Sequence, residues 1–98
     1  MSDRLFEGED RRLLELALVT WGESAQEVHA VEELSELITA LARTHRGRAS
    51  DADVIDELAD VLVVANQLAL IYGREDVEDR LEYKLQRLGV RLDEEVGL

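Results

Sequence analysis

The stretch that decides the fold is Ile55-Asp56-Glu57-Leu58-Ala59-Asp60-Val61-Leu62-Val63-Val64-Ala65. Its second half, residues 61–65, is apolar at every position, and a helix without a polar side has to be buried all round. A chain with only three further helices of similar length can hardly enclose it. We therefore expect an obligate dimer or tetramer, with this helix near its centre.

The acidic half of this stretch is repeated 24 residues earlier in the chain. Val31-Glu32-Glu33-Leu34-Ser35-Glu36-Leu37 matches residues 55–61 conservatively at all seven positions. Each segment contains two acids three residues apart, and such a pair shares one face of a helix. The sequence therefore predicts two helices that present the same acidic pattern.

Outward from these segments, the sequence predicts an all-α fold, a bundle of four helices joined by short loops. There is no proline, and Leu, Ala, Glu and Arg are abundant. Two pairs have capping-box spacing, Ser24 with Glu27 and Ser50 with Asp53. Three glycines each follow a long helix-compatible run: Gly22, Gly47 and Gly73. The expected helices are 9–21, 24–45, 51–72 and 75–95.

Composition narrows the classes of protein. The 98 residues suit one domain, 1–98, and carry 23 acidic against 11 basic side chains, a net charge of −12. This acidity argues against nucleic-acid binding, and the absence of cysteine excludes disulfides and thiolate metal sites. No apolar run is long enough to span a membrane. The charged N-terminus lacks a signal-peptide pattern, so we expect a cytoplasmic protein.

The acids of residues 24–45 gather on one side of the expected helix. Glu33 and Glu36 lie 60° apart, and Glu32 lies 40° beyond Glu36. His29 falls between Glu33 and Glu36 in angle, one turn earlier, and Gln26 precedes Glu33 by a heptad. This acidic face begins directly beside the apolar arc of the same helix.

Residues 51–72 repeat the arrangement on a helix built for burial. Glu57 and Asp60 again lie 60° apart, and Gln67 follows Asp60 by a heptad on the same stripe. Asn66 points roughly opposite Glu57, which favours an oligomer contact over a place in the site.

Two facing helices of this kind bring four or five carboxylates together, and such like charges repel unless a cation lies between them. Oxygen ligands suit Mg²⁺, with Mn²⁺ as a substitute, and such an ion polarises phosphoryl oxygens. A solvated acidic surface is the alternative interpretation.

Two groups of basic residues offer the opposite charge. Arg80, Lys84, Arg87 and Arg91 form a stripe on the last helix. The connection between the two acidic helices adds three arginines without an intervening acid: Arg43, Arg46 and Arg48. Either group suits a polyphosphate, with Lys84 and Arg87 the first candidates, although ordinary salt bridges explain any one residue slightly better.

The pattern Glu33-x-x-Glu36, then Glu57-x-x-Asp60, resembles the signature of the all-α nucleoside triphosphate pyrophosphohydrolases, and most closely the short MazG-like proteins. The resemblance extends to Trp21-Gly22, to Gln26 before the first motif and to Gln67 after the second. It ends with Lys84-Leu85-x-Arg87-Leu88, where the longer MazG pattern has Asn and Phe in place of Glu82 and Leu85.

This resemblance implies a helical dimer or tetramer that cleaves a nucleoside triphosphate to the monophosphate and pyrophosphate, as in nucleotide-pool house-cleaning. It implies Mg²⁺ held by Glu33, Glu36, Glu57 and Asp60. Glu32 would be a further ligand or a base that orients water, which completes the catalytic set. The candidate substrate-binding residues are Gln26, His29, Gln67, Lys84 and Arg87.

Two other functions stay open from the sequence. One is phosphoribosyl-ATP pyrophosphohydrolase activity, which would use the same metal-dependent hydrolysis on a larger substrate. An acidic helical dimer without enzymatic activity, acting as a protein-binding regulator, would carry the same composition.

Overall fold

The computed structural model describes residues 4–97, and within that range it contains four α-helices and no strand. Each helix begins and ends within one residue of its predicted position, so the all-α, four-helix prediction is confirmed. The helices are α1 (Gly8–Trp21), α2 (Glu23–His45), α3 (Asp51–Tyr72) and α4 (Arg74–Val96).

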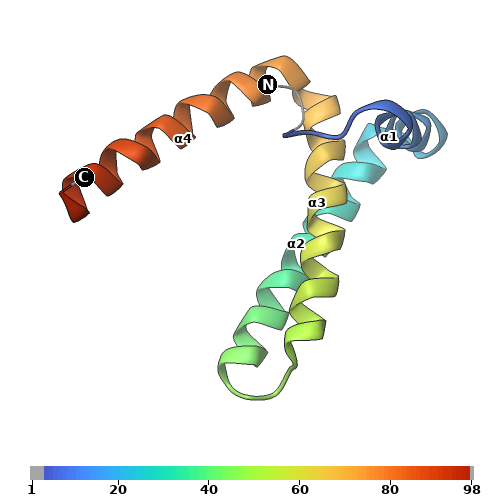
Figure 1. Cartoon of the computed structure of the whole chain (residues 1–98). Coiled ribbons are helices and arrows are strands. Elements are labelled where there is room, and N and C mark those ends of the chain that lie inside the picture. The colour runs from blue at the N-terminus through green and yellow to red at the C-terminus, as the bar shows by residue number, and fades with distance from the viewer. Residues whose placement is uncertain (1–3, 98) are drawn as a thin grey trace.

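Helices α2 and α3 form an antiparallel pair that carries the core (Figure 1). The buried hydrophobic side chains of the described residues all lie on this pair, and three of the four are alanines: Ala30, Ala40, Val64 and Ala69. Such small side chains let two helix backbones approach closely. Helix α1 packs against both members of the pair. The acidic segments of α2 and α3 consequently face each other.

The second predicted capping box is present at the start of α3. Asp53 donates its backbone N–H to Ser50 Oγ at 3.4 Å, and Ser50 donates its own N–H to Asp53 Oδ2 at 2.9 Å. The Asp53 carboxylate also accepts a hydrogen bond from the Ser50 hydroxyl at 3.1 Å, and the two bonds that it accepts hold the pKa of Asp53 below its usual value. The two backbone N–H bonds satisfy donors that the first turn of a helix leaves without partners.

The first predicted capping box, Ser24 with Glu27, is wrong. Helix α2 already begins at Glu23, and its N-cap is Gly22, which makes no side-chain capping bond. Gly22 has φ of +89° and also ends α1, so a single residue separates the two helices. Glu27 instead accepts a hydrogen bond from the Tyr72 hydroxyl at the end of α3.

The N-terminal segment, residues 4–7, is tied to the corner between α3 and α4. Phe6 donates its N–H to Asn66 Oδ1 at 2.8 Å, and Arg74 forms an ion pair with Glu7 at 2.6 Å. Asn66 also donates to the Leu62 carbonyl at 2.8 Å. Both ends of the buried Asn66 amide are thus bonded inside the chain, and its predicted oligomer contact stays a prediction.

Helix α4 leaves the other helices after this corner and contacts only α3 among them (Figure 1). The radius of gyration is 16.2 Å, whereas a compact domain of this length has about 13 Å. A single chain thus does not close into a four-helix bundle. No helix in residues 4–97 is long and apolar enough to cross a membrane.

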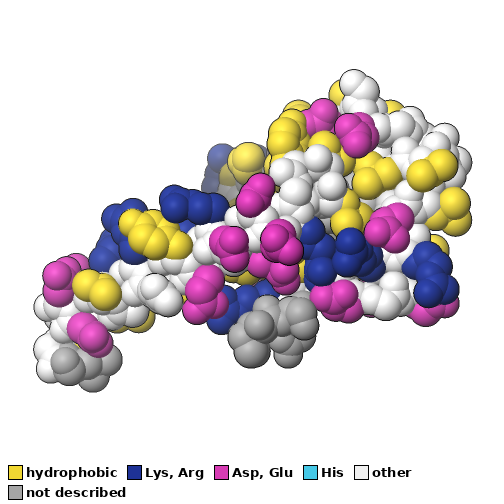
Figure 2. Space-filling view, turned by 90° about the horizontal axis from the view of Figure 1, so that it is seen from above, with side chains coloured by type: hydrophobic (Ala, Val, Ile, Leu, Met, Phe, Trp, Pro, Cys, Tyr) yellow, Lys and Arg dark blue, Asp and Glu magenta, His cyan; other side chains and the backbone are white. Residues whose placement is uncertain are grey.

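Many apolar side chains lie at the surface of the single chain. Of the apolar run 61–65, only Val64 is buried. On α4, the leucines Leu85, Leu88 and Leu92 are all exposed. In Figure 2 hydrophobic side chains lie at the surface of both the α4 arm and the wider part of the molecule. An oligomer that covers them stays a prediction.

Candidate functional site

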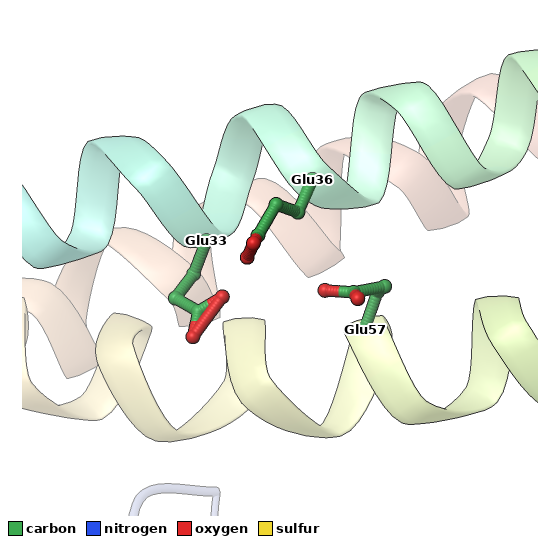
Figure 3. Close-up of side chains that lie close together, drawn as sticks. All are labelled: Glu33, Glu36 and Glu57. Carbon is green, nitrogen blue, oxygen red and sulfur yellow. The ribbon is translucent and has the colours of Figure 1, made fainter.

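Three predicted metal ligands lie together between α2 and α3. Glu33 and Glu36 extend from α2 and Glu57 extends from α3 into the space between the two helices (Figure 3). One carboxylate oxygen from each of the three lies within 4.8 Å of the others. The helix pairing therefore brings the two acidic motifs to one place, as the repeat predicted.

Asp60, the fourth predicted ligand, belongs to a second group that overlaps the first. Oxygens of Asp56, Glu57 and Asp60 also lie within 4.8 Å of one another, so Glu57 is common to both groups. The hydrogen bond with Glu36 is the largest cause of the raised pKa of Glu33, and burial is the largest cause of that of Glu57; the negative charge of Asp60 adds a smaller contribution to both. Asp60 therefore acts electrostatically on acids of both helices.

The acids are partly withdrawn from solvent. Glu33 Oε2 and Glu57 Oε2 are buried and have no hydrogen-bond partner within residues 4–97. A hydrogen bond with Glu36, followed by burial and repulsion from Glu36 and Asp60, raises the pKa of Glu33. Burial, followed by repulsion from neighbouring acids, raises the pKa of Glu57. Negative charge at both positions is thus costly unless a cation compensates it.

His29 and Glu32 lie at the open edge of this cluster. His29 Nε2 is 3.7 Å from Glu33 Oε1, and its Nδ1 is 3.9 Å from Glu32 Oε1. The side chain of Glu32 is 68% exposed, whereas that of Glu33 is 14% exposed. The two neighbouring acids therefore have different surroundings, and only Glu33 lies between the helices.

The two predicted glutamines contact each other. Gln67 Nε2 donates to Gln26 Oε1 at 2.9 Å, across the interface between α3 and α2. Gln67 is 2% exposed, and its Oε1 is buried without a partner among the described residues. The structure thus gives this pair a packing contact, and its role toward a substrate stays a prediction.

A pocket of about 320 Å³ extends from the acids toward the turn that joins α2 to α3. Glu36 and Glu57 line it together with Asp53, and two arginines of the turn region, Arg43 and Arg48, line the same pocket. Its size lies at the lower end of small-molecule sites. Acidic and basic groups therefore meet in one concave surface.

Lys84 and Arg87 do not join the acids within one chain. They lie on α4, which makes no contact with α2, and they line a separate hollow with Leu88 and Arg91. Arg80 and Arg87 also lie over the Tyr83 ring, at 4.6 and 5.9 Å from its centre.

The sequence favours Lys84 and Arg87 over Arg43 and Arg48 as phosphate ligands. In the structure, Arg43 and Arg48 line a pocket with the acids, whereas Lys84 and Arg87 do not. The sequence does mark this segment as unusual, because no acid occurs in residues 37–50 of this very acidic chain. Whether its arginines lie near the acidic cluster depends on how the chain turns after α2, and helical periodicity does not describe that turn.

Comparisons with protein-family models, curated proteins and solved structures found no match for this chain. The family resemblance therefore rests on the residues quoted above, and function has to be argued from the site.

Proposed function

We propose that this protein is a Mg²⁺-dependent nucleoside triphosphate pyrophosphohydrolase. It would cleave the bond between the α- and β-phosphates and release a nucleoside monophosphate and pyrophosphate. The observation that carries the proposal is that Glu33 and Glu57, which extend from two helices into the space between them, each have a buried carboxylate oxygen without a hydrogen-bond partner among residues 4–97.

These oxygens fit a small divalent cation. Mg²⁺ binds oxygen at about 2.1 Å, so two of its ligands lie up to about 4.2 Å apart. The oxygens of Glu33, Glu36 and Glu57, which lie within 4.8 Å of one another, reach such spacing with small side-chain movements. Within residues 4–97, no Lys or Arg forms an ion pair with these acids or with Asp60. Glu33, Glu36 and Glu57 therefore suit one ion, and Asp60 lies beside Glu57 in the overlapping group.

A bound Mg²⁺ would neutralise phosphate charge and polarise the phosphoryl group under attack. The oxygen of a water molecule then forms a bond to the α-phosphorus, and the bridging P–O bond breaks with its electron pair leaving on pyrophosphate. Glu32, exposed at the edge of the cluster, would orient that water. His29, whose ring nitrogens lie within 4.0 Å of Glu32 and Glu33, would take up the proton that the water loses.

Pyrophosphate release measured across a panel of nucleoside triphosphates, with and without Mg²⁺, tests the proposal. Glu57→Gln and Asp60→Asn should each abolish release while circular dichroism shows unchanged helicity. Glu23→Gln, which removes an exposed acid from α2, is the matched control and should retain activity. Full activity of either site variant, or no activity of the wild type on any substrate, would contradict the proposal.

The two other functions give different results in the same experiment. Phosphoribosyl-ATP pyrophosphohydrolase activity would show as release from phosphoribosyl-ATP alone, once that substrate joins the panel. A protein-binding regulator is supported by the exposed apolar side chains, and it would release no pyrophosphate.

The proposal includes a homodimer or homotetramer. A chain of this length gains stability by covering the exposed apolar side chains of α3 and α4 with further copies. An oligomer would also give the basic stripe of α4 an acidic partner surface.

A further inference from the structure

We propose that Arg43 and Arg48 form a subsite that binds the pyrophosphate portion of a polyphosphate, in the pocket that they share with Glu36 and Glu57. The nature of the ligand rests on the proposed function. The subsite itself rests on the backbone turn, the pocket and the charges of the described residues.

The turn after α2 brings the two arginines together. Arg48 donates its backbone N–H to the Arg43 carbonyl at 2.8 Å, and Gly47 donates to the Thr44 carbonyl at 2.9 Å. These two bonds, with φ of +71° at Gly47, define a Schellman motif. The motif folds Arg48 back over the last turn of α2, where Arg43 lies. Both residues consequently line one pocket although five positions separate them.

The guanidinium groups of these arginines are available to a ligand. Neither Arg43 nor Arg48 forms an ion pair within 4.0 Å among residues 4–97, and both are exposed. Arg43 does lower the pKa of Asp53, but less than the hydrogen bonds with Ser50 do. Asp53 is thus already satisfied by the capping box, and Arg43 keeps its donors.

The pocket has the polarity that a triphosphate chain requires. One part is lined by Glu36 and Glu57, the acids proposed to hold Mg²⁺ beside the scissile phosphate, and another by the two arginines. Planar guanidinium groups donate paired hydrogen bonds to phosphate oxygens and retain their charge at every physiological pH. They would hold the leaving pyrophosphate and stabilise the negative charge that it gains.

Arg46 provides a matched control within the same turn. It lies between the two arginines in sequence and is exposed, but it does not line the pocket. Replacing Arg46 removes the same charge from the same segment. A general attraction of anions to a basic loop would depend on all three arginines equally, whereas a subsite depends on two.

The test is titration calorimetry of inorganic pyrophosphate with the full chain in Mg²⁺, for the wild type, Arg43→Gln, Arg48→Gln and Arg46→Gln. The two subsite variants should bind roughly tenfold to hundredfold more weakly, as expected for loss of charge-assisted hydrogen bonds. Arg46→Gln should bind within about twofold of the wild type. Arg43→Lys should recover only part of the loss, because an ammonium group lacks the paired donors.

Binding by Arg43→Gln and Arg48→Gln equal to that of the wild type would overturn the subsite. Equal weakening by Arg46→Gln, or no binding by the wild type, would overturn it as well. These outcomes are separate from the proposed function, which the release of pyrophosphate from nucleotides tests. An active wild type whose KM for nucleotide is unchanged in both subsite variants would refute the subsite and leave the hydrolase assignment standing.

Discussion

Gln67 donates its side-chain amide to Gln26 across the interface of α3 and α2, with 2.9 Å between Nε2 and Oε1. Gln67 is the least exposed large side chain among the described residues, so its amide has no ready access to water. Its hydrogen bond is therefore part of what holds the acid-bearing helices in register.

Gln26→Ala should lower the free energy of unfolding by about 1–3 kcal/mol, because it leaves the buried Gln67 amide without an acceptor. The double variant Gln26→Leu with Gln67→Met should recover most of this loss, since it removes donor and acceptor together. Urea unfolding followed by circular dichroism measures both. A cost below about 0.5 kcal/mol for Gln26→Ala, the level of a neutral surface change, would contradict this role.

The two serines of the predicted capping boxes should respond differently to mutation. Ser50→Ala should cost about 1 kcal/mol of unfolding free energy, because Ser50 caps α3 through Asp53. Ser24→Ala is the control, and it should change stability by less than about 0.5 kcal/mol because Ser24 makes no capping bond. Equal effects of the two substitutions in thermal unfolding would refute this distinction.

The local patterns in the sequence predicted the helices well, because helix ends depend on nearby residues. Gly22 and Gly73 marked helix ends, and the spacing of Glu33 and Glu57 with their partners placed four acids on facing surfaces. These inferences needed only the helical repeat and the pairing of two helices.

Features that depend on the direction of the chain after a helix ends were not predicted from the sequence. Helix α4 contacts α3 but not α2, which separates Lys84 from the acids within one chain. The Schellman motif at Gly47 brings Arg48 to the pocket instead. Asn66 binds the backbone of Phe6, an irregular segment that no periodicity describes. Each of these is a contact between segments whose relative placement no local rule determines.

The free energy of unfolding should fall at high pH, because Tyr72 then loses its phenolic proton. Its hydrogen bond to Glu27, followed by repulsion from that carboxylate, raises the pKa of Tyr72 above 10, the ordinary value. The folded state therefore binds the phenolic proton more tightly than the unfolded state. The resulting stability is complete below pH 10 and is lost as the pH rises through the raised pKa. Melting temperatures measured from pH 9 upward should fall less steeply for Tyr72→Phe than for the wild type, and parallel curves would contradict this assignment.

Formation of the proposed oligomer should depend on the exposed leucines of α4. Leu88→Glu places a charge among exposed leucines and should dissociate the oligomer at micromolar concentration, because burying an unpaired carboxylate is costly. Gln86→Glu adds the same charge to an exposed polar position of α4 and should leave the oligomer intact. Light scattering during gel filtration gives the mass of each. A wild type that is monomeric, or a Leu88→Glu variant with the wild-type mass, would show that α4 is not the interface.

Removing one charge from the acidic cluster should stabilise the metal-free protein. Glu57 loses solvent on folding and meets other acids, and both effects raise its pKa, so its negative charge opposes folding in the absence of a cation. Glu57→Gln should therefore have a higher melting temperature than the wild type in buffer with a chelator. With Mg²⁺ and a nonhydrolysable nucleotide the order should reverse, because the wild type gains about 2.7 kcal/mol at a hundredfold excess of ligand over its Kd. Glu23→Gln should follow the wild type in both conditions. A Glu57→Gln variant that melts below the wild type in chelator would mean that the charge of Glu57 is already balanced inside the chain, and the case for a cation between α2 and α3 would fail.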